Sequence, residues 1–387
     1  MTEKPKPKIL IIGNLEDNHL KKFTNNLKKN DSKLCMDVFS TNYLSKKNYS
    51  SKEIPFCNNI YYITRHFSKF VYKISVLKFF FYMLDMRFSI KTQLQNRYDI
   101  VNIHYVSFLF LFVKSYLFKI TNKIIISPWG SDVYRINAIQ AYLYRTIYNT
   151  ADYIATSSIR FRRDVQHKFL VPDAKFVNLG FGSEIIDLIS DASDLTKEQA
   201  KLSLGLSNRY VIGCGYNASP FQNHKMIINS ISKIKEFLPE NFILLFQMTY
   251  PKYREYISEI ENLLQQEKLP YIIYSEYLDG DKVVNIKKCT DLFIHIQKTD
   301  AFSGSVQEAL LCNTKVINGS WLRYPDLETY GIPYYIVESI DKLDDIIISS
   351  INDRREIIPI QLKFEIEKKG LNYQSKKWLD FFNDYSM

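Results

Sequence analysis

Residues 291–324, DLFIHIQKTDAFSGSVQEALLCNTKVINGSWLRY, decide the fold of this chain. Apolar side chains alternate with other side chains over 292–296, which is the period of a β-strand, and 315–318 is the next strand candidate. Between the two strands, Ser303 or Gly304 can begin a helix. This order predicts a βαβ unit, in which a ligand binds beyond the carboxyl ends of the parallel strands.

Two acidic residues fall at that edge, Asp300 in the loop and Glu308 on the second turn of the helix. Ser303, Gly304 and Ser305 lie between them at the helix start, where free N–H groups and the helix dipole favour an anion such as a phosphate. A carboxylate beside a phosphate site is useful if it accepts hydrogen bonds from sugar hydroxyls. The stretch therefore predicts a site for a sugar phosphate. The alternative is a solvated loop acid and a glutamate on the helix surface.

With these residues the stretch resembles the donor site of the GT-B glycosyltransferases, especially family 4, which carries an acid, seven residues and a glutamate, here Asp300 and Glu308. A segment of small residues follows over 316–320. The resemblance implies that Glu308 holds the ribose hydroxyls of the nucleotide, that Asp300 approaches the transferred sugar, and that the amides of Gly304 and Ser305 meet the diphosphate. It also implies transfer with retention of the anomeric configuration. The family usually has glutamate first, one methylene longer than aspartate.

The length and the alternation of strand and helix candidates predict two α/β domains. A chain of 387 residues is long for one core, and alternating elements imply parallel sheets with helices on both faces. The resemblance implies two Rossmann-like domains facing a cleft: an acceptor-binding domain over 1–182, a nucleotide-sugar-binding domain over 183–370, and a helix over 371–387 that crosses back to the first domain. Strand candidates in the first domain are 8–13, 34–39, 60–63, 99–104, 123–127 and 153–155.

Composition favours an anionic partner. The formal net charge is +10 and the isoelectric point is near 9.0, which suits a nucleotide, a phospholipid surface or a nucleic acid. Five scattered cysteines without a C-x-x-C pair indicate neither a disulfide framework nor a zinc site, and they fit a reducing cytoplasm. No apolar stretch reaches the length of a membrane-spanning helix. We expect a cytoplasmic protein, peripheral on the inner face of the cell membrane.

The region 65–91 combines aromatic and basic residues. An amphipathic helix of this kind can lie in a membrane interface, attracted by anionic lipids. A core-packed helix with a solvated basic face fits the same pattern. The family resemblance favours the membrane, because related enzymes that glycosylate lipid-linked acceptors often dock this way. The apolar positions are Phe70, Ile74, Leu77 and Phe81, and the basic positions are Lys69, Lys73, Lys78, Arg87 and Lys91.

Two candidate bases precede the domain boundary. The turn PWGSDVYR, residues 128–135, follows a strand and precedes a helix, and it resembles the Gly-x-Asp turn of the family's acceptor domain. Asp132 could orient an acceptor hydroxyl or, in an inverting enzyme, remove its proton, whereas the alternative is a helix N-cap formed by Ser131 or Asp132. His104 ends the preceding strand and is a second candidate, although such a histidine is more often packed. Other residues expected on the acceptor side are Gly13, Asn14, Gly130 and Ser131.

The second domain opens with a strand over 210–215 and the loop YNASPFQNHKM. Tyr216 stands where family 4 members usually carry an arginine, and the loop resembles, more weakly, the Asn-Ser…Asn-x-His loop of bacterial transferases that add an acetamido-dideoxyhexose to a lipid-linked precursor. Lys225 and the amides at the helix start are candidate diphosphate ligands, against the alternative of an exposed lysine. The donor-binding candidates here are Gly215, Asn217, Asn223, His224 and Lys225.

Asp279, Gly280 and Asp281 spell a D-x-D sequence, which binds a divalent metal in another glycosyltransferase fold. We expect no metal site here, because Asp281 precedes a helical run and suits its N-cap. Without a metal or other cofactor, cationic side chains and helix dipoles must neutralise the leaving diphosphate.

The sequence thus predicts a metal-independent glycosyltransferase that moves a sugar from a nucleotide-diphosphate donor to a lipid-linked glycan acceptor in bacterial surface polysaccharide assembly. Three alternatives stay open: an inverting enzyme with Asp132 or His104 as base, a sugar-nucleotide epimerase of the same fold, and a basic nucleic-acid-binding protein. We expect no nucleic-acid partner, since such a protein needs aromatic residues interleaved with Lys and Arg along a groove.

Overall fold

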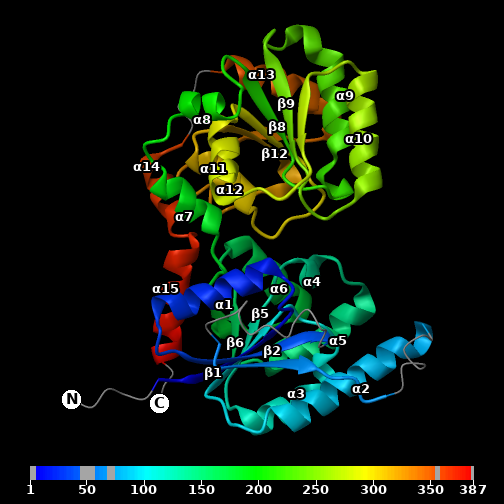
Figure 1. Cartoon of the computed structure of the whole chain (residues 1–387), viewed down its shortest axis with the longest axis vertical. Coiled ribbons are helices and arrows are strands. Elements are labelled where there is room, and N and C mark those ends of the chain that lie inside the picture. The colour runs from blue at the N-terminus through cyan, green and yellow to red at the C-terminus, as the bar shows by residue number, and fades with distance from the viewer. Residues whose placement is uncertain (1–5, 44–56, 68–74, 354–357, 385–387) are drawn as a thin grey trace. The chain divides into compact units, whose positions relative to one another are not determined.

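The computed structural model describes residues 6–43, 57–67, 75–353 and 358–384. The chain divides into two compact units (Figure 1). The first unit comprises Met1–Gly182 together with Leu371–Met387, and the second comprises Ser183–Gly370. Each unit is built on one parallel sheet flanked by helices, as expected for an α/β chain of alternating strands and helices.

The first unit carries a seven-stranded parallel sheet in the order β3-β2-β1-β4-β5-β6-β7. Its central strand β1, KILIIG, buries five of its six residues, which is typical of a parallel strand covered on both faces. The strands are β1 Lys8–Gly13, β2 Cys35–Tyr43, β3 Asn59–Ile63, β4 Ile100–His104, β5 Ile124–Ser127, β6 Tyr153–Ala155 and β7 Phe176–Val177. The helices are α1 Asn18–Asn30, α2 Ser75–Gln93, α3 Phe110–Ile120, α4 Ser131–Tyr134, α5 Ala138–Thr150, α6 Ile159–Phe169 and α15 Leu371–Asp384.

The last helix, α15, packs on the first unit. Trp378 is buried in the same core as Phe23 of α1, and its indole N–H donates to the carbonyl oxygen of Gly180 at 2.8 Å. The side-chain amide of Asn26 donates to the carbonyl oxygen of Leu371, also joining α1 to α15. These contacts tie the end of the chain to its first helix.

The second unit carries a six-stranded parallel sheet in the order β10-β9-β8-β11-β12-β13. The strands are β8 Tyr210–Cys214, β9 Phe242–Gln247, β10 Tyr271–Tyr274, β11 Leu292–His295, β12 Lys315–Gly319 and β13 Tyr335–Val337. The helices are α7 Glu184–Asp191, α8 Lys197–Ser203, α9 His224–Ile234, α10 Arg254–Gln266, α11 Gly280–Cys289, α12 Gly304–Leu311, α13 Leu343–Asn352 and α14 Ile360–Glu367.

The predicted βαβ unit is confirmed as β11, α12 and β12. The two strands pair in parallel from Leu292 opposite Lys315 to His295 opposite Asn318. Ser303 caps α12, because its hydroxyl accepts a hydrogen bond from the amide of Val306 at 3.2 Å. Parallel pairing places the carboxyl ends of β8, β11 and β12 at one edge of the sheet.

One local expectation needs correction. Asp279, not Asp281, caps α11: its carboxylate accepts from the amide of Lys282 at 2.7 Å. Within the predicted region 65–91, the structure describes α2 from Ser75, and Phe70, Ile74, Lys69 and Lys73 lie outside the described residues.

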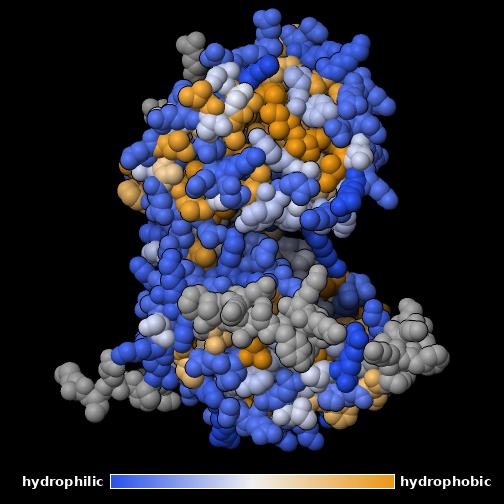
Figure 2. Space-filling view, viewed as in Figure 1, coloured by the Kyte–Doolittle hydropathy of each residue, from blue (hydrophilic) through white to orange (hydrophobic). Residues whose placement is uncertain are grey.

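The surface of α2 combines aromatic and basic side chains rather than separating them on opposite faces. Phe80 is 49% exposed and Phe88 is 43% exposed, close in sequence to the exposed Lys78 and Arg87. Helix α3 packs beside α2 and adds Phe112 and Phe118, and Figure 2 shows apolar side chains at the surface of this part of the first unit.

Candidate functional site

Asp300 lies in the loop after β11, at the shared edge of β8, β11 and β12. Its Oδ2 accepts hydrogen bonds from the side-chain amide of Gln297 at 2.5 Å and from the hydroxyl of Tyr324 at 3.2 Å. Its Oδ1 accepts no hydrogen bond from the described part of the chain. The carboxylate is therefore held through one oxygen while the other makes no hydrogen bond, and the side chain is 14% exposed.

Gln297 connects the loops that follow β8 and β11. Its side-chain oxygen accepts from the hydroxyl of Tyr216 at 3.1 Å and from the amide of Gln222 at 2.8 Å, while its own amide donates to Asp300. Burial raises the pKa of Tyr216 above its ordinary range, so that side chain is a neutral phenol. Sequence reasoning missed that Gln297 links Tyr216 and Gln222 to Asp300, because nothing local to these residues signals contacts across the sheet edge.

Glu308 is 8% exposed, so it is not a surface residue of α12. Its Oε2 lies 3.1 Å from the ammonium of Lys287 on α11, and its Oε1 accepts from the hydroxyl of Ser183 at 3.1 Å. A carboxylate oxygen has two lone pairs, so each can still accept a hydrogen bond from a ligand hydroxyl. Lys287 was not predicted from the sequence, and it also lies 3.5 Å from the hydroxyl of Ser305.

The start of α12 separates the two acids. The hydroxyl of Ser303 is occupied by its cap, but the N–H groups of Gly304 and Ser305 make no hydrogen bond within the described chain. A side-chain carbon on Gly304 would lie 3.6 Å from Oε1 of Glu308, so Gly304 lies directly beside the carboxylate. Two free amides and the positive end of a helix can hold an anion.

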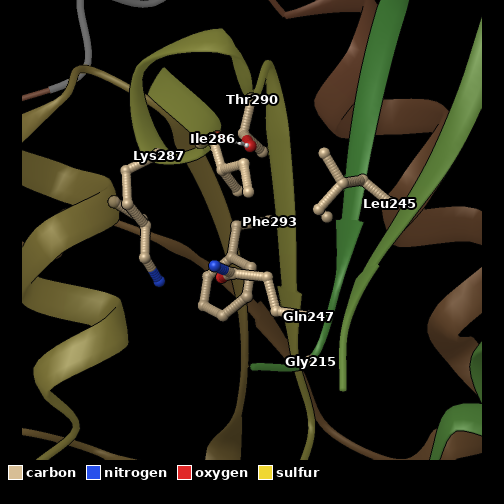
Figure 3. A pocket seen from close by; sticks show the side chains of 9 residues that line it. Gly215, Leu245, Gln247, Ile286, Lys287, Thr290 and Phe293 are labelled. Atoms are coloured by element: carbon tan, nitrogen blue, oxygen red, sulfur yellow. Dashed lines mark hydrogen bonds between the residues drawn. The ribbon is translucent and has the colours of Figure 1, made fainter. Parts of the chain in front are cut away.

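A small pocket adjoins Lys287 on the side of the sheet covered by α11 and α12. Figure 3 shows Lys287 reaching from α11 toward the space beside Gln247 and Phe293, with Gly215 at the lower end of the same pocket. The pocket is thus lined by a cation, an amide, an aromatic ring and a glycine backbone.

The loop between β8 and α9 lies against the same edge. Gly215 has a φ of +65°, and a side-chain carbon there would lie 2.8 Å from Nε2 of His224, so only glycine fits. The side-chain amide of Asn223 donates to the carbonyl oxygen of Ile296 at 2.7 Å, which joins the loop to the end of β11. Asn217 accepts from the amide of Ser219 within the loop.

Two donor-binding predictions in this loop are not supported. Lys225 is paired with Glu259 of α10, and its side chain is 47% exposed. His224 is fully buried, with Nδ1 3.2 Å from the hydroxyl of Tyr256, and burial lowers its pKa to about 4. His224 is therefore a neutral packed side chain, and Lys225 already has a carboxylate partner.

In the first unit, Asp132 holds its own turn together. Its Oδ1 accepts from the amides of Trp129 at 2.8 Å and Gly130 at 3.0 Å, and its Oδ2 accepts from the amide of Val106 at 2.8 Å. Burial raises the pKa of Asp132 to about 6, against the opposing effect of these amides. The prediction of Asp132 as a base is wrong in this structure, since both oxygens bind backbone and the residue is 1% exposed.

The helix-cap alternative is also wrong, because Gly130 occupies the N-cap position of α4 and Ser131 begins that helix without a side-chain cap. Asn14 does follow β1 at the exposed edge, where its side-chain oxygen accepts from the amides of Glu16 and Asn42.

His104 is packed rather than presented at a surface. Its ring is 5.3 Å from that of Phe23 and 5.2 Å from that of Phe181, and a side-chain carbon on Gly13 would lie 3.1 Å from its Cβ. Neither ring nitrogen has a hydrogen-bond partner among the described residues, and burial lowers the pKa of His104 to about 3. The structure therefore corrects the prediction of His104 as a base.

Solved structures with this architecture identify the fold. The chain is similar to a glycosyltransferase from Rickettsia africae, with 15% identity over 98% of both chains and a TM-score of 0.72. The chain has the GT-B glycosyltransferase fold. It is also similar to HepE from Anabaena in complex with UDP and glucose, with 14% identity over 98% of this chain and 97% of that one and a TM-score of 0.63.

Sucrose-phosphate synthase from Thermosynechococcus elongatus shares the GT-B fold as well, with 13% identity over 97% of this chain and 98% of that one and a TM-score of 0.71. No protein-family model and no curated protein matches the chain by sequence. The predicted fold class is thus confirmed by structure alone.

No described helix is both long and apolar enough to cross a membrane. No group of three or more His, Cys, Asp and Glu side chains within the described ranges is arranged to hold a metal ion.

Proposed function

We propose that this chain is a glycosyltransferase whose second unit binds a nucleotide-diphosphate sugar. The observation that carries the proposal is the arrangement around α12: a buried ionic Glu308, two unbonded amides at the helix start, and Asp300 with one oxygen that makes no hydrogen bond. Glu308 accepts the ribose hydroxyls, the amides of Gly304 and Ser305 bind the diphosphate, and Asp300 binds a hydroxyl of the sugar. Ribose, diphosphate and sugar follow one another in a nucleotide-diphosphate sugar, in the same order as these three groups of residues.

UDP is the first nucleotide to test. The similar structures of HepE contain UDP, UDP with glucose, and UDP-glucose, and a similar enzyme from Burkholderia xenovorans is a UDP-forming trehalose-phosphate synthase. These ligands are properties of those proteins. They give this proposal a concrete panel in which UDP and UDP-glucose come first, followed by other nucleoside diphosphates and their sugars.

We propose a retaining transfer without a metal. In this scheme the departing phosphate helps to deprotonate the acceptor hydroxyl, so no protein base is needed on the opposite face of the sugar. The enclosed positions of Asp132 and His104 favour this scheme over inversion, because neither offers an accessible atom for a proton. Lys287 and the start of α12 supply positive charge close to Glu308, where the leaving diphosphate would need it.

We further propose that the acceptor is a lipid-linked glycan of bacterial surface polysaccharide assembly, reached from the cytoplasmic face of the membrane. Support comes from the exposed surface of α2 and α3. Phenylalanine side chains can enter a lipid interface while neighbouring lysine and arginine side chains attract anionic headgroups. The exposed side chains of the α2–α3 surface include Phe80, Phe88, Phe112, Phe118, Lys78, Arg87, Lys91 and Lys119.

Two substitutions separate the proposed roles. Glu308→Gln removes the charge that accepts ribose hydroxyls, and we expect calorimetric binding of UDP and UDP-glucose to weaken at least about tenfold, or 1.4 kcal/mol. Asp300→Asn leaves UDP binding within about threefold but slows sugar transfer. The matched control is Glu255→Gln, an exposed glutamate of α10. If the wild type binds UDP and Glu308→Gln binds it with the same affinity, the assignment of Glu308 to the ribose is contradicted.

A further inference from the structure

His295 is a buried titratable side chain that the proposed roles do not use. It ends β11 and is 0% exposed. Its Nδ1 lies 2.8 Å from the side-chain oxygen of Asn318, and its Nε2 lies 3.5 Å from Oδ2 of Asp300. The imidazole thus lies between a neighbouring strand and the acid that we assign to the transferred sugar.

The hydrogen-bond partners of Asn318 fix the tautomer of this imidazole. The side-chain amide of Asn318 donates to the carbonyl oxygen of Leu322 at 2.9 Å, so the oxygen of Asn318 is the atom that faces His295. That oxygen can only accept, so Nδ1 of His295 must carry a hydrogen. A neutral imidazole has one ring N–H, which leaves Nε2 as a bare lone pair directed at a carboxylate.

Nε2 of His295 makes no hydrogen bond within the described chain. Without a proton between them, buried Nε2 and Oδ2 of Asp300 are two acceptors that repel each other. One proton between them turns this repulsion into a charge-assisted hydrogen bond. We propose that His295 is the positioning residue for Asp300, and that Nε2 of His295 and Oδ2 of Asp300 share one proton. The inference rests on the proposed function, in which Asp300 contacts the sugar.

The shared proton determines which way Asp300 points. With the proton in place, Oδ2 is held by His295, Gln297 and Tyr324, and Oδ1 is left for a sugar hydroxyl. The other titratable rings around His295 are Tyr216, stacked at 6.1 Å, and Tyr324 at 6.3 Å. Burial raises the pKa of Tyr216, which stays neutral and supplies no competing charge.

The direct test is nitrogen-15 NMR of the full chain with labelled histidine and no ligand. The chain has six histidines, and the signals of His295 are those lost in His295→Gln. At about pH 7.5, where an unpartnered histidine is mostly neutral, we expect both nitrogens of His295 to carry hydrogen in the wild type. In Asp300→Asn only Nδ1 should keep it. If His295→Gln does not fold, the signals that change in Asp300→Asn give the assignment.

Tyr324→Phe is the matched control, since it removes another donor to Oδ2 and should leave both nitrogens of His295 protonated. A bare Nδ1, or an Nε2 in the same state in wild type and Asp300→Asn, would overturn the inference. This measurement needs no nucleotide, so it is independent of the proposed function. If His295 and Asp300 share a proton but the chain binds no nucleotide sugar, the proposed function is refuted and the inference about His295 is not.

Discussion

At the residue scale, the candidate site depends on one buried ion pair. Glu308 and Lys287 have side chains 10% and 9% exposed, and they lie on different helices. A buried pair is weak evidence for net stability, because both charges lose their hydration, but loss of one partner leaves the other uncompensated. Lys287 therefore offsets part of the cost of burying the carboxylate of Glu308.

Lys287→Met should destabilise the second unit by about 3–5 kcal/mol and weaken nucleotide binding, because the carboxylate of Glu308 loses its only cationic partner among the described residues. Urea unfolding and calorimetry measure the two effects. Lys287→Arg keeps the charge and should lose less of both. If Lys287→Met and Lys287→Arg lose equal stability and equal nucleotide affinity, the shape of the side chain rather than its charge matters at this position.

His104 gives a pH-dependent prediction in the first unit. Its pKa is lowered from 6.5 to about 3 in the folded chain, so the folded state binds fewer protons than the unfolded state between these values. The free energy of unfolding therefore falls as the pH drops through this window. His104→Phe should remove this contribution and make the first unit more resistant to unfolding at about pH 4 to 5.

The measurement is urea unfolding of the wild type and His104→Phe at several pH values, each with a sugar-transfer assay. We expect the two stability curves to converge near neutral pH and transfer to persist. Complete loss of transfer in a folded variant would restore His104 as a catalytic candidate.

At the element scale, α12 is the helix that positions most of the proposed donor site. Its cap fixes where the helix begins, and the free amides of Gly304 and Ser305 exist because the helix begins there. A frayed first turn would move both amides and also Gly304, which lies against Glu308.

Ser303→Ala should cost about 1 kcal/mol of stability, the usual value of a lost N-cap, and should weaken nucleotide binding as well. The matched control is Asn137→Ala, which removes the cap of α5 in the first unit. The control should lose similar stability and keep its affinity for nucleotide. If both variants bind nucleotide as the wild type does, the start of α12 is not part of the site.

Strands and the βαβ unit could be predicted from the sequence because their signals are local. The buried runs at 8–13 and 153–155 match β1 and β6 in both bounds, and the helix between β11 and β12 begins where Ser303 can cap it. A buried parallel strand is recognisable as a short apolar run whatever it packs against.

Side-chain roles that depend on distant partners could not be predicted. The sequence around Asp132 suggests a carboxylate that is accessible to a substrate. In the structure this carboxylate accepts from three backbone amides instead, one of them 26 residues away at Val106. Lys225 is paired with Glu259, 34 residues later. Lys287 faces Glu308 only because α11 and α12 pack side by side. No periodicity in the sequence reports such contacts.

At the scale of the whole molecule, the membrane proposal rests on the net charge of +10 and on the exposed α2–α3 surface. We expect the protein to float with vesicles that contain anionic phospholipid at low salt, and to dissociate as salt screens the charges. The double variant Phe80→Ser and Phe88→Ser should lose most of this binding.

Phe237→Ser is the matched control, because Phe237 is 70% exposed in the second unit, outside this surface. It should bind vesicles as the wild type does. Equal binding of both variants, or binding that does not depend on anionic lipid, would contradict the membrane proposal.

We propose that the second unit binds a nucleotide-diphosphate sugar through Glu308 and the start of α12 without a metal. Thermal stabilisation of the full chain tests it most directly, with a panel of nucleoside diphosphates and nucleotide sugars, UDP and UDP-glucose first, each with and without EDTA. A ligand at 100 times its dissociation constant adds about 2.7 kcal/mol of stability. We predict a selective shift that EDTA does not change and that Glu308→Gln abolishes. No shift with any nucleotide, or an equal shift in Glu308→Gln, would contradict the account.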